Sequence, residues 1–242
     1  MQALQPRARR PGEILNAAFQ IILSHYDVVV LASAVFLVPG ILIMLVLPER
    51  SVVVGIIGCL LMLAASTAVM AVVSDIYTGG ETDVRRSVRE VVSRSGSILG
   101  ASIFQGILLV VGFLMLVGPA FIFYAWTFAM PAAVVLEGAG AYASYGRSRA
   151  LTNGFMVHIL TTVVAAWAIF GVALLGGMLA IVVAMGLGLD PRYMDPLLGV
   201  VVCLVYPFVS AVTTVLYYDL RIRQEGFDAQ RLSGPLNPEA PV

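Results

Sequence analysis

The chain has 242 residues, of which 60% are hydrophobic and only 12% are charged, and its formal net charge at pH 7 is zero. This composition excludes an ordinary soluble domain, because a fold of this length has no interior large enough for so much apolar surface. The lack of net positive charge also argues against nucleic acid as a partner. We therefore expect a membrane protein whose apolar side chains are covered by the lipid bilayer.

The basic residues are all arginines, 14 in number, and most lie in four short stretches between apolar runs. These stretches hold Arg7, Arg9 and Arg10; Arg85, Arg86, Arg89 and Arg94; Arg147 and Arg149; and Arg221, Arg223 and Arg231. Cytoplasmic loops of multi-pass membrane proteins carry such an excess, so we expect these stretches and both termini in the cytoplasm. Arginine without lysine suits a GC-rich genome, which favours a bacterial plasma membrane.

The apolar runs predict an all-α polytopic membrane protein with six spans, because a spanning helix needs about 20 apolar residues. In chain order the expected spans cover residues 28–47, 52–73, 98–117, 120–136, 156–187 and 196–217. Gly118-Pro119 alone separates the third span from the fourth. The alternative is one re-entrant element over residues 98–136, but it would put the arginines before and after it on opposite sides of the membrane.

Three polar segments predict helices that lie on the cytoplasmic membrane surface, over residues 12–24, 82–95 and 139–153. The first begins at Pro11, and Thr82 or Asp83 is the expected cap of the second. The first two have an apolar face, formed by Ile14, Leu15, Ala18, Ile21 and Ile22 and by Val84, Val88, Val91 and Val92.

The order of one surface helix followed by two spans occurs three times along the chain. A parallel three-fold repeat explains this order, and so does any six-span protein with three cytoplasmic loops. Residues 1–232 are expected to form a single membrane domain. The proline-containing segment 233–242 is expected to be a disordered cytoplasmic tail.

The acidic side chains with a potential function lie at the ends of the predicted spans. We expect them to pair with arginines at the level of the headgroups, and the favoured pairs join Glu137 or Asp219 to Arg147, Arg149 or Arg221. A proton or substrate relay is the alternative, but it requires a carboxylate nearer the middle of the membrane. The predicted ion-pair and headgroup-binding residues are Arg85, Arg86, Arg89, Glu137, Arg147, Arg149, Asp219 and Arg221.

The sequence predicts no catalytic, metal-binding or cofactor-binding residue. His25 and His158 have no carboxylate or cysteine partner close in the sequence, and Cys59 and Cys203 lie inside apolar runs. The phosphate-binding loop, the HExxH zinc motif and the GxSxG serine motif do not occur. We therefore expect a protein that is not an enzyme and that has no cofactor.

Four segments resemble one bacterial membrane family. Residues 9–19 (RRPGEILNAAF) resemble its GEILDAAF start, and residues 131–138 (PAAVVLEG) with 148–155 (SRALTNGF) resemble its central block. Residues 217–228 (YYDLRIRQEGFD) resemble its YYDLRVRREGFD tail. The chain thus resembles the glycerophosphoryl diester phosphodiesterase membrane-domain family over nearly its whole length. The resemblance implies a helical membrane module only, because the phosphodiester chemistry of fused members belongs to a soluble barrel domain that these residues do not resemble.

These features agree with two main functions. The first is a non-enzymatic scaffold or accessory module that engages anionic lipids, a protein partner or a second copy of itself at the cytoplasmic face. The alternative is a transporter or permease subunit that needs a separate ATPase or partner. Prolines in or beside the spans motivate the alternative, because they can kink helices around a cavity: Pro39, Pro119, Pro131 and Pro207. A lipid-modifying enzyme is the third and least favoured possibility.

Overall fold

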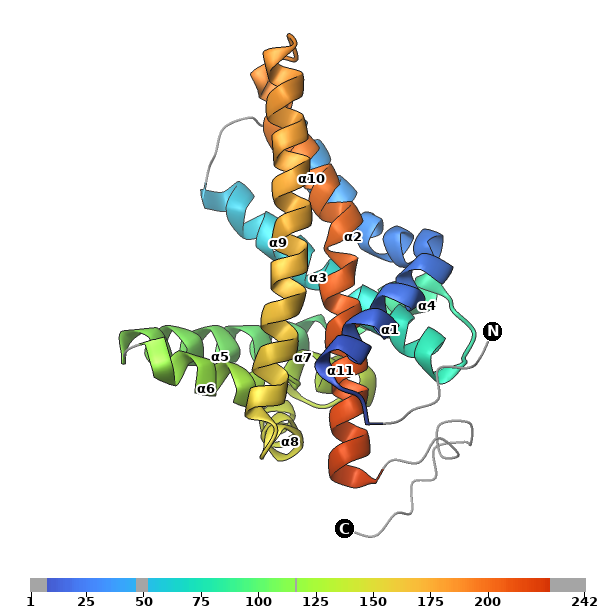
Figure 1. Ribbon diagram of the computed structural model, residues 1–242, viewed down its shortest axis with the longest axis vertical. Coiled ribbons are helices and arrows are strands. Elements are labelled where there is room, and N and C mark those ends of the chain that lie inside the picture. The colour runs from blue at the N-terminus through green and yellow to red at the C-terminus, as the bar shows by residue number, and fades with distance from the viewer. Residues whose placement is uncertain (1–7, 47–51, 116, 227–242) are drawn as a thin grey trace.

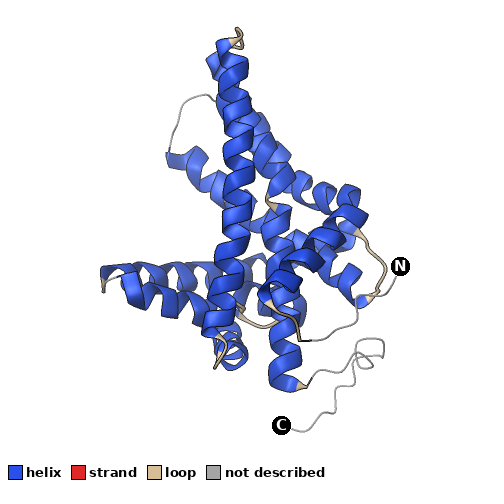
Figure 2. Ribbon diagram, viewed as in Figure 1, coloured by secondary structure: helices blue, strands red, loops and turns tan. Residues whose placement is uncertain are grey.

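The computed structural model describes residues 8–46, 52–115 and 117–226 (Figure 1). Within these ranges the chain consists of α-helices, one short 3-10 helix and no strand, which confirms the predicted all-α fold (Figure 2). The elements are α1 (Pro11–Ser24), α2 (Tyr26–Val46), α3 (Val52–Thr78), α4 (Val84–Ser93), α5 (Ser95–Leu114), α6 (Val117–Thr127), α7 (Met130–Glu137), α8 (Ala141–Thr152), α9 (Met156–Gly186), η1 (Pro191–Tyr193), α10 (Met194–Val205) and α11 (Pro207–Glu225). The tail predicted over 233–242 lies outside the described residues.

Six helical segments of the described chain are long and apolar enough to cross a membrane, which confirms the predicted class. They are Tyr26–Val46, Val52–Thr78, Ser95–Leu114, Gly118–Glu137, Met156–Gly186 and Pro191–Glu225. The second segment continues past residue 73 because Tyr77 stacks on Tyr218, with ring centroids 5.2 Å apart. The sixth continues past residue 217 because ion pairs between residues four positions apart stabilise a polar end of α11.

The third and fourth spans form a helical hairpin, and whether it crosses the membrane twice or re-enters it stays a prediction. The two helices touch closely at Gly112, where an added Cβ would come within 2.6 Å of the Ala120 Cα. The hairpin of α5 and α6 lies across the direction of the long helix α9 (Figure 1). Large apolar side chains on both of its helices are exposed, among them Ile107 and Phe121. Such an exposed apolar surface is expected to contact lipid.

Two of the six spans are interrupted at prolines. The fourth consists of α6 and α7, which are separated at Phe128 and Ala129, and Pro131 lies in the first turn of α7. The sixth is interrupted at Tyr206, and α11 starts at Pro207. Proline has no N–H to donate, so a helix ends or bends where it occurs. The other two prolines singled out in the sequence interrupt no helix: α2 runs through Pro39, and Pro119 lies in the first turn of α6.

Helix α1 packs its apolar face against the protein itself. The predicted helix starts at Pro11 as expected, and its buried residues are Ile14, Ala17, Ala18, Ile21 and Ile22. They belong to a core that also contains Val72 of α3 and Leu216 of α11. The amphipathic pattern of α1 therefore reflects burial in the fold, whereas the sequence analysis assigned it to the membrane surface. The buried face includes Ala17, which was not predicted, whereas the predicted Leu15 is only partly buried.

The other two predicted surface helices are also present. Helix α4 is shorter than the predicted segment 82–95, and the Asp83 carboxylate caps it by accepting from the Arg85 N–H at 2.9 Å. The predicted valine face of α4 is split, since Val91 is buried and Val92 is 61% exposed. Helix α8 forms despite Gly146, and one of its buried residues is Ser148. The order of one short helix and two spans holds three times, and the three-fold repeat itself stays a prediction.

Candidate functional site: ion-pair network, arginine helix and cavity

The eight predicted site residues fall into four places in the structure. Glu137, Arg147 and Arg221 meet at the ends of α7, α8 and α11. Asp219 lies nearby on α11, with partners from the segment before α1 and from α9. Arg149 covers an aromatic ring, and Arg85, Arg86 and Arg89 lie together on α4. The structure thus brings three of the eight residues together in one cluster and leaves Asp219, Arg149 and the α4 arginines outside it.

The first cluster, which we name the Glu137 node, consists of Glu137, Arg147, Tyr217, Arg221 and Glu225. Arg147 holds the Glu137 carboxylate with two hydrogen bonds, from Nε to Oε2 at 2.7 Å and from Nη2 to Oε1 at 2.8 Å. Tyr217 donates its hydroxyl to the same carboxylate, and Arg221 lies 3.5 Å from it. Glu225 binds both arginines. The hydrogen bonds to Glu137 and Glu225 raise the pKa of Arg147 above its ordinary value.

The second cluster, the Asp219 node, consists of Arg9, His158, Asp219 and Arg223. The Asp219 side chain is 1% exposed and accepts three hydrogen bonds. They come from the backbone N–H of Arg9 at 2.6 Å, from His158 Nε2 at 2.9 Å and from Arg223 Nε at 2.7 Å. Arg223 also donates to the Arg9 carbonyl at 2.6 Å. The node therefore fixes the start of α1 and the start of α9 to α11.

The sequence analysis found only part of the two nodes. It expected Glu137 or Asp219 to pair with Arg147, Arg149 or Arg221. Glu137 pairs with Arg147 and Arg221 as expected, whereas Asp219 pairs with Arg223 and Arg149 covers the Trp126 ring instead. It found no carboxylate close to His158 in the sequence, and the structure supplies one from a helix 61 positions away, Asp219. A spacing of four residues was a sequence signal for two further pairs, and it was missed: Asp219 with Arg223, and Arg221 with Glu225. Residues four positions apart in a helix lie on the same face.

Helix α8 closes the break in the fourth span. The backbone N–H of Ala129 donates to Ser148 Oγ at 3.0 Å, and Ser148 donates its hydroxyl to the Trp126 carbonyl at 2.7 Å. The neighbouring Arg149 lies over the Trp126 ring, 4.4 Å from its centroid. A buried backbone group without a partner is costly, so Ser148 compensates for the helical hydrogen bonds that are lost at the break. Arg149 is therefore involved in packing and does not join either node.

A further arginine holds the end of α7. Arg94, which follows α4, donates from its guanidinium to the carbonyls of Val134 and Val135. Gly138 ends α7 in the left-handed conformation with φ of 71°. The last carbonyls of a helix lack partners within the helix, and a cation there also interacts favourably with the helix dipole. Arg94 therefore acts within the fold, which distinguishes it from the other three arginines of its stretch.

The three remaining arginines of that stretch are exposed on α4. Arg85, Arg86 and Arg89 all point away from the buried side of the helix, which carries Ser87 and Val91. The ion pair of Arg86 with Glu90 at 3.2 Å is open to solvent on both sides. Among the residues that the structure describes, neither Arg85 nor Arg89 forms a side-chain ion pair. Helix α4 thus presents a positive surface with Val92 beside it.

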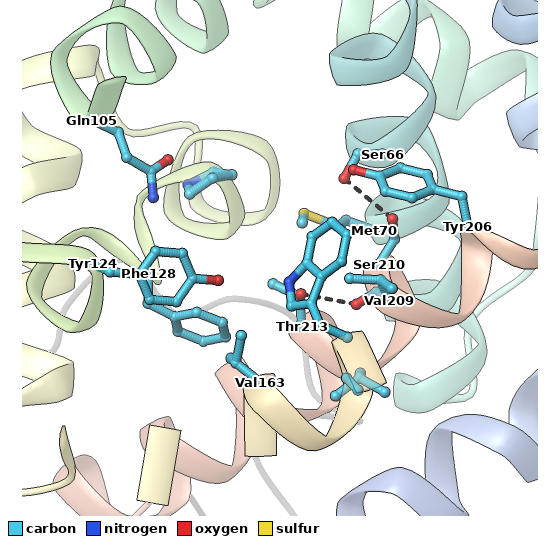
Figure 3. Close-up of a pocket in the computed structure, with 14 residues that line it drawn as sticks. Ser66, Met70, Gln105, Tyr124, Phe128, Val163, Tyr206, Val209, Ser210 and Thr213 are labelled. Carbon is cyan, nitrogen blue, oxygen red and sulfur yellow. Dashed lines mark hydrogen bonds between the residues drawn. The ribbon is translucent and has the colours of Figure 1, made fainter. Parts of the chain in front are cut away.

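A cavity of about 180 Å³ lies where the two interrupted spans meet α3, α5 and α9. Figure 3 shows Gln105 of α5 and Tyr124 of α6 on one side of it, and Ser66 of α3 with Tyr206 and Ser210 on the other. Ser66 and Ser210 hydrogen-bond to each other at 3.2 Å. The described lining residues include none with a charge. The cavity lies beside Pro131 and the Tyr206 break, so two of the four prolines singled out in the sequence flank it.

The described residues contain no group of three or more histidine, cysteine or acidic side chains that could hold a metal ion. Comparisons of the chain with protein-family models, with curated proteins and with solved structures give no match. The structural features that bear on function are therefore the two nodes, the arginines of α4 and the cavity.

Proposed function

We propose that this chain is a non-enzymatic membrane scaffold or accessory module whose helix α4 engages anionic lipid headgroups at the cytoplasmic face of a bacterial plasma membrane. The observation that carries the proposal is the exposure of three arginines on α4. Guanidinium groups bind phosphate oxygens in bidentate geometry, and arginines next to a membrane are attracted to anionic lipids. With six spans, both termini lie on the same side as α4.

The contacts of the other arginines favour α4 over the remaining predicted headgroup residues. Arg147 binds two carboxylates, and Arg149 covers the Trp126 ring. A headgroup would have to compete with these contacts, whereas on α4 it competes only with the exposed pair of Arg86 and Glu90. The exposed Val92 adds an apolar side chain that can enter the lipid beside the headgroups.

We also propose that the chain is a relative of the glycerophosphoryl diester phosphodiesterase membrane-domain family. The support is that the resembling segments supply most of both nodes. The central block contains Glu137 and also Ser148, which closes the helix break. The tail contains Tyr217, Asp219 and Arg223. The matching residue types are thus those that hold the helix ends together, which agrees with a shared fold and implies no shared catalysis.

Replacement of Arg85, Arg86 and Arg89 by glutamine should abolish the enrichment of anionic lipid around α4. Each arginine near an anionic surface contributes about 1 kcal/mol, so the three together should enrich such lipid up to about 100-fold at low salt. The measurement uses a fluorophore on Ser93→Cys, with Cys59 and Cys203 replaced by alanine, in nanodiscs that contain a trace of anionic lipid with a quencher on its headgroup. Quenching should be strong, should weaken with added salt and should be lost in the triple variant.

Arg192→Gln is the matched control, because Arg192 is also an exposed arginine but lies in the η1 turn after α9, which we expect on the other side of the membrane from α4. This variant should be quenched as strongly as the parent. Equal quenching of the parent and the triple variant would contradict the headgroup proposal. Equal quenching by a neutral lipid with the same quencher would do so as well, since it would show proximity without charge selection.

A transporter or permease subunit is the second candidate function. The observation that favours it is the cavity between two interrupted helices. Interrupted spans form the substrate sites of many transporters, because the ends of the half-helices expose backbone groups inside the membrane. The described residues contain no nucleotide-binding motif, so active transport in this role requires a separate ATPase or partner.

A further inference from the structure

The cavity has the features of a ligand site within the membrane-spanning part of the chain. The hydroxyl and carboxamide groups on its wall come from the middle parts of their spans: Ser66, Gln105, Tyr124, Tyr206, Ser210 and Thr213. Polar side chains at that depth are costly unless they have hydrogen-bond partners. Ser66 and Ser210 satisfy each other across the interface of α3 and α11.

Gln105 is a partly buried polar side chain on the wall of the cavity. Within the described part of the chain its carboxamide has no hydrogen-bond partner, and it points toward the cavity (Figure 3). A carboxamide offers two N–H donors and a carbonyl acceptor. The Tyr124 hydroxyl also points toward this space, and it comes from the next helix of the same hairpin. Together they offer donors and an acceptor to a molecule inside the cavity.

The rest of the wall is apolar and aromatic. Phe128 is 3% exposed and Met70 is 5% exposed, and the Trp167 ring of α9 lies on the same wall. An apolar cavity of about 150 Å³ takes up benzene, so a space of about 180 Å³ holds a molecule with a single ring. The uncharged wall disfavours an ion, because nothing there compensates for its lost hydration.

We propose that the cavity binds a small uncharged molecule with one ring, or an equally small apolar body, and one hydroxyl or amide group. The body packs against Phe128, Met70 and Trp167, and the polar group bonds to the Gln105 carboxamide and the Tyr124 hydroxyl. This inference is independent of the headgroup proposal, since it involves no residue of α4, and either can fail while the other holds.

Trp167 provides the reporter for a binding experiment. The chain has two tryptophans, so Trp126→Phe leaves only Trp167, which lines the cavity, and Trp167→Phe leaves only Trp126 beneath Arg149. The full chain in nanodiscs is titrated with phenol, with benzene and with benzoate, and fluorescence is excited where phenol does not absorb. Phenol should change the Trp167 emission saturably and leave that of Trp126 unaffected. Benzoate, which is charged at pH 7, should have no effect.

Gln105→Leu tests the assigned hydrogen bonds. This variant should bind phenol about 5- to 10-fold more weakly and bind benzene as well as the parent does, because only the polar contact is lost. Unchanged benzene binding also shows that the variant is folded. Gln20→Leu, at an exposed position on α1, is the matched control and should leave both affinities unchanged.

Three results would overturn the inference. A response that is linear and equal for both tryptophans would mean that phenol only partitions into the lipid. The absence of any response would mean that water or a lipid chain occupies the space. Equal affinities for phenol and benzene, unaffected by Gln105→Leu, would show an apolar void without a polar recognition group.

Discussion

Replacement of Asp219 by asparagine should lower the thermal unfolding midpoint of the chain in lipid nanodiscs by about 10 °C. Asp219 is 1% exposed and is the shared acceptor for Arg9, His158 and Arg223. Removal of one partner from a buried ion pair costs about 3–5 kcal/mol, because the remaining charge stays buried without compensation. In a chain of this size each kcal/mol corresponds to about 2–4 °C.

Asp190→Asn is the matched control for this prediction. Asp190 also pairs with an arginine, Arg192, at 3.3 Å, but more than half of each side chain is exposed. Exposed ion pairs contribute about 0–1 kcal/mol, so the unfolding midpoint should move by no more than about 2 °C. If the two variants lose similar stability, the Asp219 node does not hold α1, α9 and α11 together in the way its contacts indicate.

Replacement of Gly112 by alanine should destabilise the hairpin of α5 and α6 by about 2–3 kcal/mol. The added Cβ would come within 2.6 Å of the Ala120 Cα and within 2.9 Å of its backbone nitrogen. Backbone atoms cannot rotate away as a flexible side chain does, so the helices have to separate. Excess volume at a tightly packed contact costs about 1–3 kcal/mol, and this site belongs at the upper end of that range. Thermal unfolding in nanodiscs measures the effect.

Gly106→Ala on the same helix separates packing from helix propensity. An added Cβ at Gly106 meets nothing within 4 Å, so this variant gains only the greater helix propensity of alanine, about 1 kcal/mol. Its unfolding midpoint should stay the same or rise, while that of Gly112→Ala falls. A fall of similar size in both variants would mean that α5 and α6 do not approach each other at Gly112.

The membrane helices could be predicted from the sequence because two strong physical signals agree. Runs of about 20 apolar residues predict spans, and arginines between the runs predict the sides of the membrane. The helix boundaries were less accurate where the protein itself covers the chain. Tyr77 lies past the predicted end of the second span, yet its contact with Tyr218 keeps the helix intact to Thr78.

The same limit explains why the sequence did not predict what covers the apolar face of α1. Its apolar spacing predicts a helix with one buried face, but a buried face looks the same in the sequence whether lipid or protein covers it. In the structure the cover is the protein core, and Ile14 is completely buried there. Helix α11, which covers this face, lies far from α1 in the sequence. The pattern of residues 12–24 therefore contains no information about it.

The candidate site was predictable where its contacts are local, or where opposite charges lie at the same predicted membrane surface, as Glu137 and Arg221 do. The pair of Asp219 and Arg223 follows from a spacing of four on one helix. The hydrogen bond of Tyr217 to Glu137 joins residues 80 positions apart, and that of Arg9 to Asp219 joins residues 210 positions apart. No periodicity connects such residues. The cavity was anticipated only through Pro131 and Pro207, since its wall is assembled from several separate helices.

The most direct test of the account is the side of the membrane on which α4 and the η1 turn lie. Single cysteines at Ser93 and at Arg192, both exposed, are introduced into the chain with Cys59 and Cys203 replaced by alanine. Intact bacterial cells are treated with a thiol reagent that does not cross membranes. The account predicts that Arg192→Cys is labelled at once and that Ser93→Cys is labelled only after the cells are opened. Labelling of Ser93→Cys on intact cells, or of both positions from the same side, would contradict it.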